Sequence, residues 1–256
     1  MIGVIAGDVI GSAYEFSRFK RKTFEPLFHS KARFTDDTVC TVAVADALTT
    51  GSDPQETMIR WCTKYAENGG WGRQFALWFL SDAPEAYGSW GNGAAMRVSA
   101  VGHLASDEAQ VVSWSNRFTE MTHNHPEAMD SAQAVALAIF WAKRGLSMAS
   151  IMRALTDRYG YDLARTPEEI RPTYMRTERA VDSVPQAISC AIHADGFEDA
   201  IRNAVSLGGD SDTIAAIAGG IAEAAFGVPK SIREAALGYL PEDMRAVVSC
   251  FYDRVR

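Results

Sequence analysis

The sequence lacks the features of a disulfide-stapled, basic or membrane-bound protein. Only four cysteines occur among 256 residues, none in a CxxC pair, and they lie far apart at Cys40, Cys62, Cys190 and Cys250. This spacing is typical of reduced cytosolic thiols. Acidic residues outnumber basic ones, 32 against 25, giving a net charge of -7. That balance argues against strong nucleic-acid binding or an anionic membrane as partner.

Long hydrophobic runs are also missing. No apolar run reaches the roughly 20 residues that a membrane-spanning helix needs. The apolar start, residues 1–6, has no basic region and is followed almost at once by Asp8, which disfavours a signal peptide. We therefore expect a cytoplasmic protein with no membrane partner, and we expect it to be monomeric.

Strand signals are scarce, whereas helix signals are frequent. No pair of alternating runs flanks a two-residue turn. Asp53 before Pro54 predicts one capped helix start, and Ser147 and Gly160 predict the two ends of another. Six of the nine prolines precede apolar-periodic segments and are predicted to open helices: Pro54, Pro126, Pro167, Pro185, Pro229 and Pro241. We predict an all-α fold in a single domain over residues 1–256.

Two predicted helices, 38–48 and 213–226, consist almost wholly of small apolar residues. Small side chains allow helix backbones to approach closely, and Gly219-Gly220 would otherwise cost roughly 1 kcal/mol per glycine relative to alanine. We expect these to be two central helices in contact with each other.

Each of these two helices begins with a group of oxygen-bearing side chains, Thr35-Asp36-Asp37-Thr38 and Gly208-Gly209-Asp210-Ser211-Asp212-Thr213. Helix capping explains one or two of the aspartates. Four carboxylates at converging helix ends would repel one another unless cations neutralise them. Oxygen ligands without sulfur or histidine favour Mg²⁺, Mn²⁺ or Ca²⁺. A site for two divalent ions and simple helix capping both remain open at this point.

Four ordered segments carry a more specific signal. They are Gly7-Asp8-Val9-Ile10-Gly11 with Glu15, Phe34 to Thr38, Ser89 to Arg97 and Gly208 to Thr213, with Thr122-His123 between the third and fourth. This set resembles the ADP-ribosyl-glycohydrolase family, which includes dinitrogenase-reductase-activating glycohydrolase. The resemblance implies an all-helical fold with a central binuclear Mg²⁺ or Mn²⁺ site. The metal ligands that it implies are Thr35, Asp36, Asp37, Asp210, Asp212 and Thr213, with Ser211 pointing away.

The resemblance also assigns a catalytic set and a substrate cleft. It makes Glu15 an acid/base or gating residue, and the base is one of Glu15, Asp36 and Asp37; the plainer alternative for Glu15 is a surface glutamate. The residues implied to contact ADP-ribose are Gly70, Gly72, Ser89, Trp90, Gly91, Asn92, Gly93 and His123. A turn after a helix would equally explain the glycines of segment 68–72, and a bond to the backbone would explain His123.

The predicted function is hydrolysis of the glycosidic bond between ADP-ribose and an acceptor, either a protein side chain or a small molecule. Two other interpretations remain open: a catalytically idle relative that binds ADP-ribose or serves structurally, and a two-metal nucleotide phosphoesterase. The fold match alone does not prove activity.

Overall fold

The protein is built from helices, and the computed structural model describes residues 1–255 of it. Arg256, the last residue of the predicted domain, lies outside the described residues. In chain order the helices are α1 (Ile2–Ser12), α2 (Asp36–Thr50), α3 (Pro54–Lys64), η1 (Ala66–Asn68), α4 (Arg73–Phe79), η2 (Asn92–Arg97), α5 (Ser99–Leu104), α6 (Glu108–Thr119), α7 (Pro126–Lys143), α8 (Met148–Tyr159), α9 (Pro167–Ile170), α10 (Ala180–Ile192), α11 (Phe197–Leu207), α12 (Ser211–Phe226), α13 (Lys230–Gly238) and α14 (Glu242–Val255), where η marks a 3₁₀ helix. The all-α prediction is confirmed.

Local capping signals set several boundaries as predicted. Asp53 caps α3 by accepting a hydrogen bond from the Glu56 backbone at 2.9 Å. Ser147 caps α8, and Gly160 ends that helix in the left-handed conformation at φ 71°. Proline occupies the first position of α3, α7 and α9 and directly precedes α13 and α14.

Pro185 is the exception, and there the prediction is wrong. It lies inside α10, which begins at Ala180. The backbone at the start of this helix pairs with Trp90 and Gly91. Ala180 N–H donates to Trp90 O at 3.0 Å, and Gly91 forms an antiparallel bridge with Arg179. Proline removes one hydrogen bond from the interior of a helix, and α10 nevertheless continues to Ile192.

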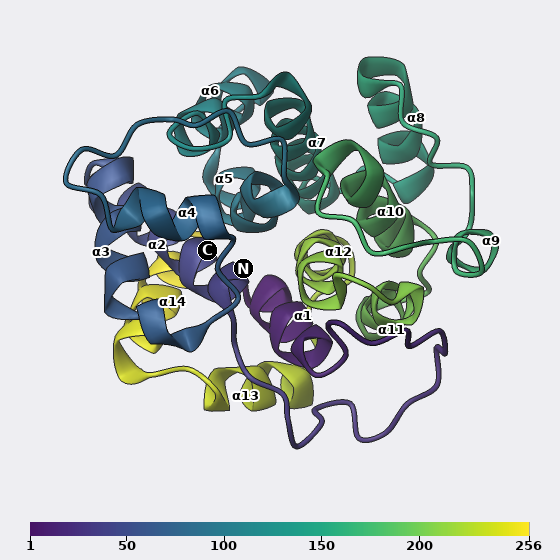
Figure 1. Cartoon of the computed structure of the whole chain (residues 1–256). Helices are drawn as coiled ribbons and strands as arrows, with labels where there is room; N and C mark the ends of the chain where they lie inside the picture. The colour runs from purple at the N-terminus through teal and green to yellow at the C-terminus, as the bar shows by residue number, and fades with distance from the viewer. Residues whose placement is uncertain (256) are drawn as a thin grey trace.

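The centre of the molecule is the pair α1 and α12, which lie side by side in Figure 1. Glycines at four-residue spacing on α1 make this possible, because they leave no side chain between the two backbones. A Cβ added at Gly7 would lie 2.0 Å from Ala215 O, and one added at Gly3 would lie 2.2 Å from Gly219 O. The two helices therefore touch backbone to backbone, and both have almost every residue buried.

This pairing corrects the expectation about the two helices of small residues. α12 packs most extensively on α1, and its contact with α2 is short. That short contact includes a hydrogen bond from Thr213 Oγ1 to Asp37 Oδ2 at 3.1 Å. The starts of α2 and α12 thus converge as expected, while α1 supplies the long central interface.

Glu223 on α12 fixes the position of α1 along this interface. Its carboxylate accepts a hydrogen bond from Gly3 N–H at 2.7 Å and also pairs with the Met1 amino group. Tyr252 of α14 donates its hydroxyl to Glu223 and accepts from Ile2 N–H at 2.9 Å. These bonds satisfy the first amide groups of α1, which carries Asp8 into the candidate site.

Within residues 1–255 no helix is long and apolar enough to cross a membrane. The cysteines are free, with Cys40, Cys62 and Cys190 buried and Cys250 exposed. The fold is therefore held by its packed helical core and not by disulfides.

Candidate metal centre and substrate cleft

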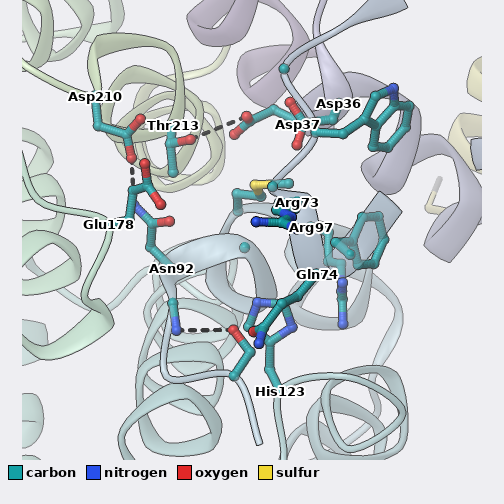
Figure 2. A pocket seen from close by; sticks show the side chains of 18 of the residues that line it. Asp36, Asp37, Arg73, Gln74, Asn92, Arg97, His123, Glu178, Asp210 and Thr213 are labelled. Atoms are coloured by element: carbon teal, nitrogen blue, oxygen red, sulfur yellow. Dashed lines mark hydrogen bonds between the residues drawn. The ribbon is translucent and has the colours of Figure 1, made fainter. Parts of the chain in front are cut away.

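One cleft of about 770 Å³ opens where α2, α12, η2 and the loop before α10 meet. With the exception of Thr35, every residue predicted from the sequence as catalytic, metal-binding or in contact with ADP-ribose lines it. In Figure 2, Asp36, Asp37, Thr213 and Asp210 lie along one side of the cleft, and His123 lies across from them. Residues 15, 36–37, 70–72, 89–93, 123, 210, 212 and 213 are thus brought into one place.

Two groups of carboxylates stand at the acidic side, and they share Asp212. Asp8, Asp37 and Asp212 form one group, and Glu15, Asp210 and Asp212 form the other. Within each group, one carboxylate oxygen from each residue lies within 4.8 Å of those of the other two. Asp37 Oδ1 is buried and has no hydrogen-bond partner within residues 1–255. An unsatisfied carboxylate oxygen among acids fits a cation, because a buried polar atom without a partner is otherwise costly.

The pKa shifts of these acids also indicate a cation site. Burial is the main cause that raises the pKa of Asp36, to about 8, and the charges of Asp8, Asp210 and Glu15 add to it. Burial and neighbouring aspartates also hold the pKa of Asp37 and Asp212 well above the usual range. Neighbouring buried carboxyl groups repel one another when they ionise. Divalent cations that prefer oxygen ligands offset this repulsion, so such a cluster suits them.

Asp8 is a residue to which the sequence analysis assigned no role. Its carboxylate is fully buried and accepts hydrogen bonds from Thr35 N–H at 2.9 Å, Thr35 Oγ1 at 2.7 Å and Thr38 N–H at 3.2 Å, and from the Thr38 hydroxyl. Asp8 therefore fixes the first turn of α2, which carries Asp36 and Asp37. The available signal was an acid inside an otherwise apolar helix.

Three predicted neighbours of the metal site occupy distinct places. Thr35 caps α2 and lies fully buried behind the cleft wall, between Asp8 and Asp37. The carboxylate of Asp36 lies directly against Gly70, where an added Cβ would be 2.2 Å from Asp36 Oδ1. Ser211 donates its hydroxyl to Gly11 O at 3.1 Å, so its side chain faces α1 and not the cleft.

Arg176 is a second residue that sequence reasoning missed. It lies in the loop between α9 and α10, and its guanidinium approaches Glu15 at 3.5 Å, Asp210 at 3.8 Å and Glu178 at 3.1 Å. Burial and the Asp210 charge raise the pKa of Glu15, while Arg176 lowers it. Nothing in the local pattern around Arg176 indicates this role, because its partners are distant in the sequence.

The segment from Ser89 to Gly93 forms the opposite wall. Asn92 N–H donates to Glu178 O at 2.9 Å, and Asn92 Nδ2 donates to Asp210 Oδ2 at 2.7 Å, which ties this wall to the acidic side. Ser89 Oγ accepts from Gly91 N–H at 3.3 Å. Trp90 is 51% exposed and lines the cleft, where its ring offers a flat apolar face.

The remaining predicted contacts also lie at the cleft. Gly70 has φ 93°, a conformation that favours glycine, and Gly72 precedes the short helix α4. Both line the cleft together with Trp71 and Arg73. His123 is buried against Gly93, where an added Cβ would lie 3.1 Å from His123 Nε2.

Comparison with known proteins decides the family. The model of the family "ADP-ribosylglycohydrolase" matches residues 1–255. The chain belongs to the ADP-ribosylglycohydrolase family. The family resemblance inferred from the four sequence segments is thereby confirmed, and the chain is a hydrolytic enzyme of this family whose aspartates are positioned to bind metal.

Individual relatives are distant. The ADP-ribosylarginine hydrolase Tri1 of Pseudomonas putida (strain GB-1) is 25% identical over 263 residues, covering 89% of this chain and 70% of the relative. The ADP-ribosylhydrolase ARH3 of Homo sapiens is 27% identical over 207 residues, covering 62% of this chain and 57% of the relative. A solved "ADP-ribosylglycohydrolase-related protein complex" matches with a TM-score of 0.73 at 22% identity, over 99% of this chain and 95% of that one, and it supports the fold.

Proposed function

We propose that this enzyme hydrolyses the glycosidic bond between ADP-ribose and an acceptor with two Mg²⁺ or Mn²⁺ ions held at the ends of α1, α2 and α12. The observation that carries the proposal is the pair of acidic groups that share Asp212 beside a glycine-lined cleft. The ADP-ribosylglycohydrolase family supplies the reaction class. Two groups with one common carboxylate suit two ions with a shared ligand.

The residues that would hold the ions are Asp37, Asp210, Asp212 and Thr213, with Asp36 and the Thr35 hydroxyl as further candidates at the start of α2. All of their donor atoms are oxygens, which suits hard divalent cations. When bound there, divalent ions would polarise substrate oxygens and lower the pKa of bound water. Asp8 would act from behind, because its oxygens already accept hydrogen bonds from Thr35 and Thr38.

Glycoside hydrolysis passes through an oxocarbenium-like state and needs carboxyl groups to activate water and protonate the leaving group. Glu15, Asp36 and Asp37 are the candidates. The Asp37 carboxylate accepts a hydrogen bond from the Thr213 hydroxyl, and the Asp36 carboxylate lies against Gly70. Glu15 is not among the proposed metal ligands, and its raised pKa favours the protonated form that a general acid needs. We therefore place Glu15 first as acid/base, with Arg176 holding it toward the acidic groups.

The wall opposite the acids suits the nucleotide part of the substrate. Backbone amides at glycines can approach phosphate oxygens closely, and the segment Ser89–Gly93 and the glycines at 70 and 72 offer them at the cleft. Trp90 offers a stacking face for a ring. Asn92 orients Asp210, so ligand binding at this wall and metal binding across the cleft are coupled through one side chain.

A substrate panel tests the proposal. The purified enzyme is incubated with ADP-ribosylated arginine, serine, nucleotide and acetyl substrates in Mg²⁺ or Mn²⁺, and the products are separated by liquid chromatography and mass spectrometry. Arginine comes first, because the Pseudomonas putida relative is named for that acceptor. Free ADP-ribose supports the proposal. AMP or phosphate would indicate a phosphoesterase, and binding without turnover an idle relative.

A matched pair of variants links the product to the site. Asp212→Asn removes the carboxylate that both acidic groups share, and we expect it to abolish release of ADP-ribose. Ser211→Ala changes the preceding residue, whose hydroxyl faces Gly11, and should retain turnover. Equal activity in the two variants would remove the acidic groups from the reaction.

A further inference from the structure

Arg97, at the end of η2, is a buried cation without a carboxylate partner among the described residues. Its side chain is 1% exposed, and no acid lies within ion-pair distance of it in residues 1–255. Instead, Nη2 donates to Phe118 O and to Thr122 Oγ1, each at 2.8 Å. Burying a guanidinium without a carboxylate partner is costly. The position of Arg97 beside Thr122 at the cleft therefore indicates a functional role.

Thr122 connects Arg97 to His123. The Thr122 hydroxyl is fully buried, and it lies 2.8 Å from His123 Nδ1. A guanidinium can only donate, so Thr122 Oγ1 accepts from Arg97. The single hydroxyl hydrogen of Thr122 is then free to point at His123 Nδ1, which is its one remaining hydrogen-bond partner within residues 1–255.

This direction of donation fixes the tautomer of His123. If Nδ1 carried the proton, Thr122 Oγ1 would accept twice and its own buried hydrogen would have no acceptor. A buried donor without an acceptor is costly, and this cost favours the tautomer with the proton on Nε2 over the tautomer with the proton on Nδ1 by about 5- to 150-fold. In that arrangement Nδ1 accepts and the ring proton resides on Nε2.

Nε2 is the ring atom that faces the substrate cleft. It lies against the glycine wall: a Cβ at Gly93 would be 3.1 Å from it and a Cβ at Gly91 would be 3.8 Å from it. His123 lines the cleft, and Tyr87 borders the ring at a centroid distance of 6.2 Å. Burial and the charge of Arg97 lower the pKa of His123 well below its usual value, so the ring stays neutral.

We infer that Arg97 and Thr122 are positioning residues that hold His123 as the neutral Nε2–H tautomer, so that it presents one hydrogen-bond donor to an oxygen of bound ADP-ribose. A donor of fixed direction suits a phosphate or ribose oxygen, both of which can accept. Arg97 thus acts on the ligand through two hydrogen bonds, by way of Thr122 and His123. The identity of the ligand rests on the proposed function, whereas the tautomer does not.

The first test therefore uses the ligand-free protein. Nitrogen-15 spectra of the histidine rings at neutral pH, with His123 assigned by its absence in His123→Gln, should show Nε2 protonated and Nδ1 as a hydrogen-bond acceptor. A ring protonated on Nδ1, or on both nitrogens, would overturn the inference whatever the substrate proves to be.

The second test measures the consequence for the ligand. Thr122→Val removes the hydroxyl at nearly constant volume, and Thr122→Ser restores it. Calorimetric titration with ADP-ribose should show about 10-fold weaker binding in Thr122→Val, together with loss of the hydrogen-bonded Nδ1 signal, and Thr122→Ser should recover both. Wild-type affinity in a folded Thr122→Val protein would contradict the positioning role. Failure of wild type to bind ADP-ribose, with the expected tautomer present, would count against the proposed function instead.

Discussion

The close packing of α1 on α12 makes Gly7→Ala the sharpest test of the fold. A Cβ at Gly7 would lie 2.0 Å from Ala215 O, 2.4 Å from Ala215 C and 2.7 Å from Ala216 N. All three atoms belong to backbone, so no side chain can rotate to make room. The helices must separate or shift along each other, and Asp8 moves with α1.

The magnitude follows from two opposing effects. Overpacking a tight core costs about 1–3 kcal/mol, and contact with backbone on both helices puts Gly7→Ala at or above the upper end of that range. Replacing a helical glycine with alanine returns about 1 kcal/mol. We expect a net loss of roughly 2 kcal/mol or more in unfolding free energy. For a chain of this size that corresponds to a fall of about 4–8 °C in Tm.

Thermal unfolding followed by circular dichroism measures this, with Gly238→Ala as the matched control. Gly238 also lies in a helix, α13, but an added Cβ there meets no atom within 4 Å. The control should be unchanged or more stable, by up to about 1 kcal/mol. If Gly7→Ala unfolds at the same temperature as Gly238→Ala, the backbone contact between α1 and α12 is not as described.

Two further predictions concern the acidic side of the cleft. Burial and neighbouring acids raise the pKa of Asp36 from 3.8 to about 8, so between these two values the folded state keeps a proton that the unfolded state has released. The metal-free protein should therefore lose stability as pH rises from about 4 to about 8 and level off above that, and Asp36→Asn should reduce that slope in denaturant titrations. A metal-free wild type whose stability is constant over this range would contradict the raised pKa. Glu15→Gln should lower the single-turnover rate by roughly 10²–10⁴-fold. Its affinity for ADP-ribose, measured by calorimetry, should stay within a few fold of wild type. A near-normal rate would assign the acid/base role to Asp36 or Asp37 instead.

The sequence predicted those parts of the structure that depend on local chemistry. Asp53 and Ser147 cap helices because a cap needs only residues within the next turn. The acids at positions 36, 37, 210 and 212 lie at helix starts, where the dipole and free amide groups favour them. With the family resemblance added, these segments were expected at one cleft, and they lie there.

The residues that the sequence did not indicate act through contacts between distant segments. Arg176 meets Glu15 across 161 positions only because two loops fold onto each other. Asp8 was visible as an acid in an apolar helix, but its bonds to Thr35 and Thr38 depend on how α1 meets α2. The glycine spacing on α1 is equally compatible with several partner helices, and pattern alone did not select α12. Pro185 was misplaced because the start of α10 is set by pairing with Trp90 and not by proline.

The central claim is that the paired acidic groups hold the divalent ions that hydrolysis requires. The direct measurement is the initial rate of ADP-ribose release by the wild-type enzyme after chelation with EDTA, with the metal content verified, followed by titration with Mg²⁺ or Mn²⁺. We expect no turnover in the metal-free enzyme and recovery on addition of either ion, because all the proposed ligands are oxygens that suit such cations. Full activity of a protein shown to be free of metal would contradict the account.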